Sequence, residues 1–332
     1  MSFERVNQLA IGGLLDEVIG LESRLVGKAP HCAFCAYGKQ CRLPDKTTVT
    51  SKVAESIGNL IKGVDKAGQR IFTDQLESKV RGRRFHTAGR EPDKDRFKGT
   101  SLFADAYSNY IHPEHQVAFS TSDTILAVEG FERKARDMGV AIESYHTDNG
   151  VYQSKGFVDM LVRNKQGIRY SGVGSKWQNG FAEGAINHIV STARTMMIHA
   201  ALHWPGEDDS SLWPMAVSHA CHLHNHIPNR ESGIAPIELF SKGKSDCLTL
   251  KNTHTWGSPC YILEPRLAQV GGKIPRWKPR SNRGQYLGVS PFHASNISYV
   301  RNLKTGRLSA QYHVVHDDWF ETVYCGDDEP PD

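Results

Sequence analysis

Hydrophobic side chains recur at steps of three and four along residues 5–26, which predicts a helix there. From about residue 70 the apolar positions form short runs instead. IFTDQLE (71–77), GTSLFADAYSNY (99–110) and HQVAFST (115–121) carry strand-type residues, with a turn between the last two. The heavily charged segment 79–98 separates the first two runs and predicts a loop.

Helical spacing returns after these strands, alternating with short apolar runs. The predicted helices cover 124–139, 155–167, 181–201 and 211–225. The predicted strands are a short one that ends near Asp148 and another at 168–173. Three strands followed by helix, strand, helix, strand and helix describe an α/β domain with a mixed sheet, in which a meander is followed by helical crossovers.

The pattern changes again after about residue 252. Short strands alternate with frequent turns, and residues 302–306 read as the tip of a hairpin. This pattern predicts a small all-β domain with a barrel-like architecture.

Composition narrows the class of protein. Hydrophobic residues make up 39% of the 332 residues and charged residues 23%, which permits a packed core and excludes wholesale disorder. The formal net charge of +4 is compatible with nucleic acid as a partner without arguing for it. No apolar run is long enough to span a membrane, and no secretory signal peptide is visible, so no membrane partner is expected. Seven cysteines, three of them within 32–41, favour a reducing compartment with a metal or free thiols.

Three acidic residues lie at positions from which they could form one metal-binding catalytic site. Asp74 lies on the first predicted strand, Asp148 at the end of a later one, and Glu183 in the first turn of the long helix. In a mixed sheet of this order the two strands can be neighbours with the helix packed over them. Gathered carboxylates repel each other, and Mg²⁺ or Mn²⁺ relieves that repulsion. Two such ions can stabilise the attacking and leaving oxygens in phosphoryl transfer.

Each acid also has an ordinary explanation. Glu183 suits the dipole of a first helical turn, Asp148 suits a turn before Asn-Gly, and Asp74 suits a solvated strand. On the helix, Glu183 shares a face with Arg194, away from the apolar stripe. Periodicity alone therefore leaves both readings open.

Several separated motifs, in order, resemble the integrase of copia-type (pseudoviral) LTR retrotransposons. HTDNG (146–150) and QNGFAE (178–183) carry the likeness, with 34 residues between Asp148 and Glu183. The other matching stretches are FTDQLES, LFADAYSNY, TARTMMIHAALHWP, LWPMAVSHACHLHNHIPN, WKPRSNRGQYLGVSPFHAS, LSAQYHVVHDDWF and CAFCAYGKQCRLP. The resemblance covers residues from about 30 to 322.

The resemblance implies a ribonuclease-H-like mixed five-stranded sheet flanked by helices and a polynucleotidyl transferase or endonuclease. Two Mg²⁺ or Mn²⁺ ions on Asp74, Asp148 and Glu183 would serve 3′-end processing and strand transfer of element DNA into target DNA. The loop 174–180 is expected to close around DNA and carry Glu183 to the metals. The residues placed near DNA are Lys176, Gln178, Asn179, Arg194, Arg83 and Arg84. A plain polar loop and a solvated hairpin tip are the alternatives for the loop residues and the Arg83–Arg84 pair.

The same resemblance implies domain boundaries and a cellular location for the chain. We expect five segments in order: a partial pre-integrase zinc-type segment (1–45), a linker helix (46–68), the catalytic core (69–240), the small β domain (250–322) and a disordered acidic tail (323–332). The chain is expected to be a polyprotein fragment that forms homo-oligomers, in the nucleus and in a cytoplasmic retrotransposon particle.

Two departures favour a decayed or domesticated DNA-binding protein instead. Of the expected two His and two Cys zinc ligands, only Cys32 and Cys35 match, with His31 or Cys41 as substitutes. Family members usually have Lys or Arg directly after the catalytic Glu, where this chain has Gly184 and Ala185.

Overall fold

The computed structural model describes residues 32–40, 63–172, 176–229, 232–243 and 248–323, together with Val6. The predicted helix at 5–26, most of the linker, residues 173–175 of the predicted closing loop and the acidic tail from 324 lie outside these ranges. Where the linker is described, residues 63–68 form turns and bends rather than the predicted helix. Among the described helices, none has both the length and the apolar composition needed to cross a membrane.

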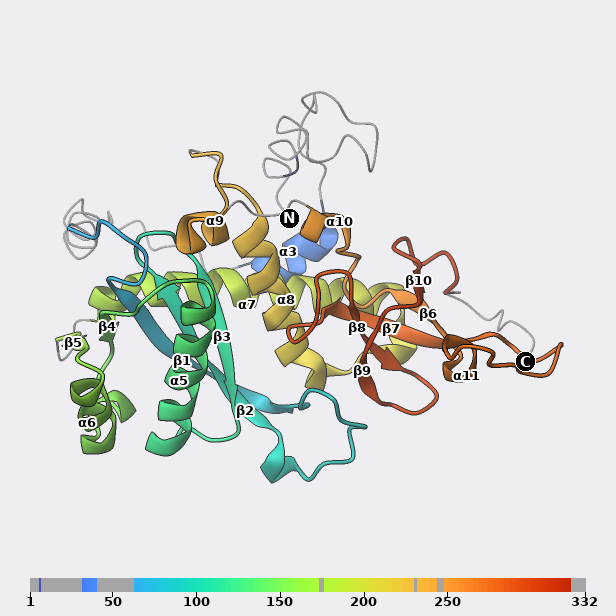
Figure 1. The fold of residues 1–332 in the computed structure, drawn as a ribbon, viewed down its shortest axis with the longest axis horizontal. Coiled ribbons are helices and arrows are strands. Elements are labelled where there is room, and N and C mark those ends of the chain that lie inside the picture. The colour runs from blue at the N-terminus through green and yellow to red at the C-terminus, as the bar shows by residue number, and fades with distance from the viewer. Residues whose placement is uncertain are drawn as a thin grey trace.

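The core of the molecule is a mixed five-stranded sheet (Figure 1). Its strands run in the order β3-β2-β1-β4-β5, where β1, β2 and β3 pair antiparallel and β1, β4 and β5 pair parallel. The elements are β1 (Ile71–Gly82), β2 (Phe97–Asp105), β3 (Ile111–Gln116), α5 (Thr121–Asp137), β4 (Ser144–Thr147), α6 (Lys155–Arg163), β5 (Gly167–Tyr170), α7 (Gly180–His203), α8 (Trp213–His226) and α9 (Pro236–Ser241). This is the predicted ribonuclease-H-like topology, with helix ends moved by a few residues.

The third strand begins earlier than the sequence predicted. The turn falls at 106–109, where the buried Asp105 carboxylate accepts hydrogen bonds from the N–H groups of Gly68 and Ser108, each at 2.8 Å. Strand β3 then runs through Pro113, which is tolerated because β3 is an edge strand. Asn225 of α8 covers that edge: its side chain accepts from the Ile111 N–H at 2.9 Å and donates to the Ile111 carbonyl at 2.7 Å.

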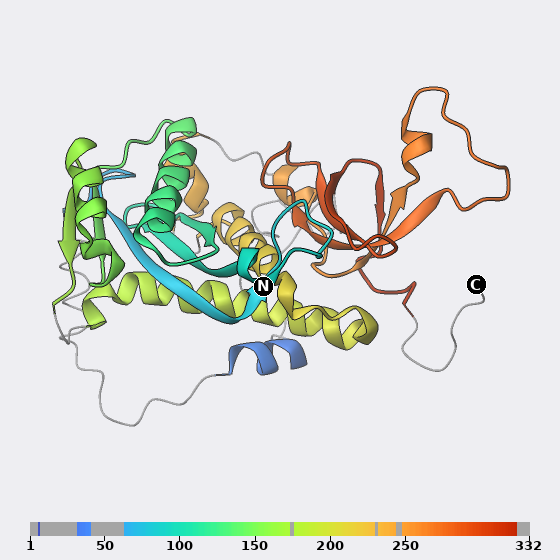
Figure 2. The ribbon, with the colours of Figure 1, turned by 90° about the horizontal axis from the view of Figure 1, so that it is seen from below.

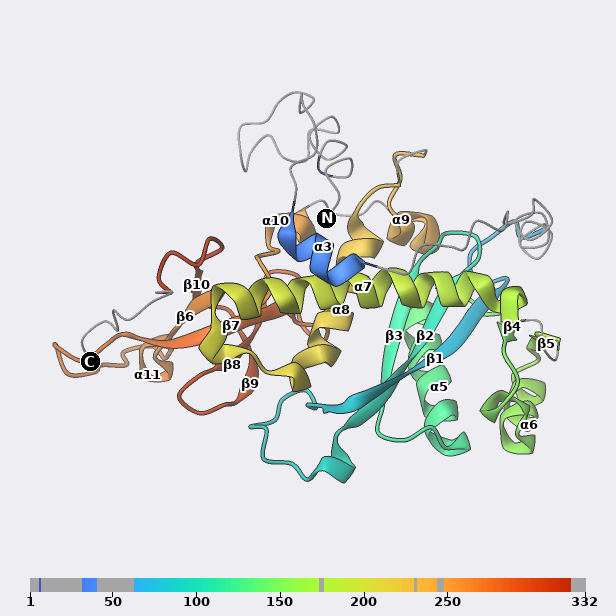
Figure 3. The same cartoon turned by 180° about the vertical axis from the view of Figure 1, so that it is seen from behind.

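Helices cover both faces of this sheet. One cluster of buried side chains joins Ile71, Phe103 and Tyr145 to Phe131 of α5 and Phe157 of α6. On the other face, α7 and α8 pack against β1, β2 and β3 (Figure 3). Because side chains alternate along a strand, each position of β1 can be assigned to one of these faces.

A second antiparallel sheet follows the core. Its elements are α10 (Leu248–Lys251), β6 (Pro259–Leu263), α11 (Pro265–Ala268), β7 (Ser281–Val289), β8 (Ser298–Asn302), β9 (Leu308–Gln311) and β10 (Val314–His316). The strands run β10-β6-β7-β8-β9, and the hairpin tip predicted at 302–306 is confirmed by the Gly306 N–H, which donates to the Asn302 carbonyl at 2.8 Å. As described, the outer strands β9 and β10 do not pair, so the sheet is open rather than a closed barrel.

The two sheets share one hydrophobic core. Trp256, Leu287 and Tyr299 belong to the same buried cluster as Ile189 of α7 and Ala216 of α8. Helix α7 runs along the back of the molecule from one sheet to the other (Figures 2 and 3). The backbone approaches closely here: at Gly257, with φ of 81°, an added Cβ would lie 2.3 Å from the Ala200 Cβ. The second sheet is therefore anchored on the helices of the core.

Arg83 ties the end of β1 to this second sheet. Its side chain is 4% exposed and donates through Nη2 to the Gly306 carbonyl at 2.6 Å, while Nη1 lies 3.8 Å from Asp209 Oδ2. Burial lowers the pKa of Arg83, and the nearby Asp209 carboxylate opposes that shift. The prediction that Arg83 contacts DNA phosphates is thus corrected: its guanidinium is used inside the protein. Arg84, next along the chain, is exposed and stays a candidate.

We expect Arg83→Ala to lower the free energy of unfolding by about 3 kcal/mol, because it leaves the Gly306 carbonyl and Asp209 without their charged partner. Arg84→Ala should change it by less than about 0.5 kcal/mol. Urea unfolding followed by circular dichroism measures both. Equal effects of the two substitutions would contradict the role given to Arg83.

Candidate active site

Asp74 and Asp148 come from neighbouring parallel strands. The register pairs Phe72 with His146 and Thr73 with Thr147, so Asp74 and Asp148 each come directly after the last pair that joins β1 to β4. Neighbouring strands lie about 4.8 Å apart, which brings the two backbones side by side. The sequence prediction that these strands are neighbours is confirmed.

The residues that lead into both acids lie on the side of the sheet that α7 covers. Phe72 lies two residues before Asp74, and its ring centroid is 5.0 Å from that of Phe181 in α7. His146 lies two residues before Asp148, and its ring is 4.8 Å from Phe72. Residues two apart on a strand share a face, so Asp74, which lies within β1, is on the α7 side of the sheet with Phe72. Asp148 directly follows the last residue of β4, next to that side.

The start of α7 brings Glu183 to the same face. Ala182 is buried in a small cluster with Phe72, and Phe181 packs against that cluster. The Asn179 side chain, 2% exposed, donates to the Thr73 carbonyl at 3.4 Å and so pins the start of α7 beside Asp74. Glu183, half-buried in the first turn, therefore lies on the helix turn that packs against the Phe72–Asp74 part of β1.

Local hydrogen bonds orient the two aspartates. Asp74 Oδ1 accepts from the Gln75 N–H, and Asp148 Oδ1 accepts from the Asn149 N–H, each at 2.7 Å. Asn149 Nδ2 donates in turn to the Ser171 carbonyl at 3.2 Å, tying the loop after β4 to the end of β5. Gly150 has φ of 96°, a backbone conformation that favours glycine and lets the chain turn directly after Asp148.

His146 is a residue of this site that the sequence reasoning missed. It is buried beneath the start of α7, and Nε2 lies 3.4 Å from Ser171 Oγ. Burial, with Arg70 and Arg169 nearby, lowers its pKa, so the ring is neutral at pH 7. Its position two residues before Asp148 on a strand was the available signal. A neutral ring here supports Phe72 without adding positive charge beside the acids.

The donor set fits Mg²⁺ or Mn²⁺, since it consists of hard carboxylate oxygens on one face of the sheet. Within the described ranges, no three His, Cys, Asp or Glu side chains are grouped closely enough to hold a metal ion. Asp74 and the start of α7 thus share one side of the sheet, and Asp148 follows the neighbouring strand, but the three carboxylates do not form a closed ligand set in this structure. A two-metal arrangement would require the three carboxylates to lie closer together than they do here.

Residues predicted to contact DNA from the loop before α7 have structural roles here. The Gln178 Oε1 accepts from the Gly172 N–H at 2.7 Å, and Asn179 points inward onto β1. Lys176 begins the short 3-10 helix Lys176–Asn179, and its side chain lies outside the described part of the chain. The predicted DNA contact of Asn179 is corrected, because its amide is buried. The contacts of Lys176 and Gln178 remain predictions.

Arg194 and the C-x-x-C lie further along α7. Arg194 is exposed and donates through Nη1 to the Gly38 carbonyl at 3.3 Å, at the end of α3 (Ala33–Lys39). Cys32 caps α3, and its Sγ accepts from the Cys35 N–H at 3.4 Å. Among the described residues no further ligand joins these two thiols, and His31 and Cys41 fall outside. Two sulfurs do not make a tetrahedral zinc site.

Gly184 offers space at the position directly after Glu183 in the helix. It is exposed, and a Cβ added there meets no atom within 4 Å. We expect Gly184→Lys to raise the free energy of unfolding by up to about 1 kcal/mol, because glycine is a poor helix residue. We also expect it to tighten DNA binding and steepen its salt dependence by about one phosphate contact. Thermal unfolding and fluorescence anisotropy check the two effects, and Gly184→Ala separates helix propensity from charge. Equal DNA affinity of the two variants would contradict a phosphate contact at this position.

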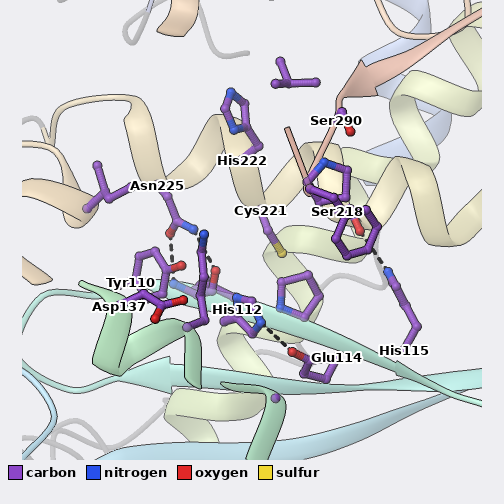
Figure 4. Close-up of a pocket in the computed structure, with 18 of the residues that line it drawn as sticks. Tyr110, His112, Glu114, His115, Asp137, Ser218, Cys221, His222, Asn225 and Ser290 are labelled. Atoms are coloured by element: carbon purple, nitrogen blue, oxygen red, sulfur yellow. Dashed lines mark hydrogen bonds and ion pairs between the residues drawn. The ribbon is translucent and has the colours of Figure 1, made fainter. Parts of the chain in front are cut away.

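A large cavity formed by the described residues lies elsewhere. It encloses about 790 Å³ between β3, α5, α8 and the loop 289–295, and contains none of the three acids (Figure 4). Two pairs of its polar side chains contact each other: His112 Nε2 lies 2.9 Å from Glu114 Oε1, and His115 Nε2 lies 2.9 Å from Ser218 Oγ. None of the metal ligands predicted from the sequence lines this cavity, so the carboxylate face stays the candidate site.

No protein-family model matches this chain, and no curated protein matches it. Among solved structures it is similar to the HTLV-2 integrase catalytic core domain in complex with magnesium, at 15% identity over 53% of this chain and 97% of that chain, with a TM-score of 0.37. The catalytic core domain of BIV integrase gives 11% identity, 53% and 95% coverage and a TM-score of 0.38. A simian T-cell lymphotropic virus intasome in complex with PP2A regulatory subunit B56 gamma gives 13% identity, 75% and 77% coverage and a TM-score of 0.40.

Proposed function

We propose that this protein is an integrase: a metal-dependent polynucleotidyl transferase that trims the 3′ ends of retrotransposon DNA and joins them to target DNA. One observation carries the proposal, namely that Asp74 and Asp148 directly follow the paired residues of the neighbouring parallel strands β1 and β4, and that α7, which begins with Glu183 in its first turn, packs beside Asp74. The motifs that resemble copia-type integrases include these same three residues. Three carboxylates on one face of a ribonuclease-H-like sheet suit phosphoryl transfer.

The roles of the residues follow from their positions. Asp74, Asp148 and Glu183 would hold two Mg²⁺ or Mn²⁺ ions. When bound, such ions lower the pKa of an attacking water or 3′ hydroxyl and stabilise the leaving oxygen. Asn179 and Phe72 act as positioning residues, because they fix the start of α7 on β1. Joining exchanges one phosphodiester for another and so needs no nucleotide hydrolysis.

A second candidate is a transposon-derived DNA-binding protein without this activity. It is favoured by Gly184, which leaves an exposed position beside Glu183 without the cation usual in the resembling family. It predicts DNA binding with no joined product under any metal condition. The integrase proposal also includes that the protein forms homo-oligomers and acts in the nucleus and in a cytoplasmic retrotransposon particle.

A strand-transfer assay with a labelled oligonucleotide duplex separates the two candidates. We expect joined products with Mg²⁺ or Mn²⁺ and none with EDTA, while anisotropy shows that the same DNA is bound. Binding without products in both metals would reject the integrase proposal in favour of the second candidate.

A further inference from the structure

An arm projects from the second sheet between β6 and β7. It comprises residues 264–280 and includes the short helix α11. Figures 1 and 2 show it extending from the end of the molecule opposite α6. Neither the motifs of the carboxylate face nor the fold of the core accounts for it.

Hydrogen bonds give the arm a defined shape. At its base, the Glu264 N–H donates to the Arg280 carbonyl at 2.8 Å. Further out, the Gly272 N–H donates to the Gln269 carbonyl at 3.0 Å. Glu264 carries the arm's one acidic side chain, and its Oε2 accepts from Asn282 Nδ2 at 2.9 Å.

A tight turn displays Trp277 to solvent. The Lys278 N–H donates to the Pro275 carbonyl at 3.1 Å, which places Arg276 and Trp277 at the two corners of the turn. Trp277 is 92% exposed. Pro275 and Pro279 bracket the turn and restrict its backbone, so the indole is held outward before any partner arrives.

Positive charge surrounds this ring. The cationic side chains of the arm, all exposed, are Arg266, Lys273, Arg276, Lys278 and Arg280. Within the part of the chain that the structure describes, no ion pair involves any of them. An exposed aromatic ring between unpaired cations is the combination that binds single-stranded nucleic acid: phosphates contact the cations, and an unpaired base stacks on the ring.

We propose that this arm is a second nucleic-acid contact, in which Trp277 stacks on an unpaired base while Arg276, Lys278 and Arg280 bind the flanking phosphates. The proposal rests on the proposed function for its choice of nucleic acid as the ligand. It adds a preference: the arm binds single strands or unpaired ends more tightly than blunt duplex, because bases inside a duplex are already stacked. Charge complementarity selects this ligand over an uncharged protein surface.

Anisotropy with a short fluorescein-labelled single strand, and with the blunt duplex of the same sequence, tests the arm in the full chain. We expect Trp277→Ala to weaken single-strand binding about tenfold and to change duplex binding little. The double variant Arg276→Ala/Lys278→Ala should reduce the salt slope for the single strand by about 1.4, the value for two lost phosphate contacts.

Matched controls separate the arm from general effects. Trp319→Ala removes a tryptophan that is 82% exposed but stands beside Asp317, Asp318 and Glu321, and it should leave binding unchanged. Arg136→Ala/Arg163→Ala removes two exposed cations on α5 and α6 and should alter the salt slope less than the arm variant does.

Three outcomes overturn the proposal: equal effects of Trp277→Ala and Trp319→Ala, no effect of Trp277→Ala on the single strand, or Trp277-dependent binding to phosphatidylserine vesicles without binding to DNA. The last outcome would identify the arm as a membrane contact, since exposed tryptophan with cations also suits a lipid headgroup layer. The readout is equilibrium binding without metal. The arm proposal can therefore hold even if the strand-transfer assay gives no product, and strand transfer can be observed even if the arm proposal is wrong.

Discussion

Asp148→Asn should lose at least about 100-fold in strand-transfer rate while binding DNA as tightly as the unmodified protein. The substitution keeps the size of the side chain and its capacity to accept a hydrogen bond from the Asn149 N–H. It removes the negative charge that a divalent cation needs. Because Asp148 is exposed, the fold should be unaffected. The loss therefore reports on chemistry rather than on stability.

Asp159→Asn is the matched control for this experiment. Asp159 is exposed on α6, and its substitution makes the same change of charge away from the carboxylate face. Single-turnover rates with Mg²⁺ and Mn²⁺, measured beside anisotropy for DNA affinity, distinguish the two variants. If Asp148→Asn joins DNA at the rate of Asp159→Asn, Asp148 is not a metal ligand.

Phe72→Ala should lower the free energy of unfolding by about 3–5 kcal/mol, the usual cost of removing a buried phenylalanine. Phe72 is fully buried and fills the space between His146 of β4 and Phe181 of α7. Its loss leaves a cavity at the point where α7 is seated on the sheet. The start of α7 carries Glu183, so activity should fall even under conditions in which the variant is fully folded.

Val80→Ala is the comparison for this second prediction. Val80 lies on the same strand but is exposed, so its truncation should cost less than about 1 kcal/mol. Urea unfolding gives the two free energies. Hydrogen exchange at the start of α7 should increase in Phe72→Ala and remain unchanged in Val80→Ala. Similar stability of the two variants would show that Phe72 does not seat the helix.

The strand and helix positions of the three acids could be predicted from the sequence because each lies in, or directly after, a locally determined element. Apolar runs fix the strands before Asp74 and Asp148, and Asn149-Gly150 marks where the second one ends. Helical spacing fixes the start of α7 near Glu183. Face alternation then follows from strand geometry alone.

The misjudged positions depend on partners distant in the sequence. Arg83 bonds to Gly306, 223 residues away, and nothing local distinguishes it from its exposed neighbour Arg84. Strand β3 contains Pro113, which read as a turn because the bond from Asn225 of α8 to Ile111 was not foreseeable. Asn179 looked like a loop residue until β1 supplied its partner. Tertiary contacts, rather than local preference, decide such side chains.

The most direct test of the carboxylate site is to locate Mn²⁺ by anomalous diffraction in crystals of the protein bound to a processed DNA end. The account predicts manganese about 2.0–2.2 Å from carboxylate oxygens of Asp74, Asp148 and Glu183, beside the terminal phosphate. Manganese bound elsewhere, or Glu183 turned away from the two aspartates with DNA in place, would contradict it.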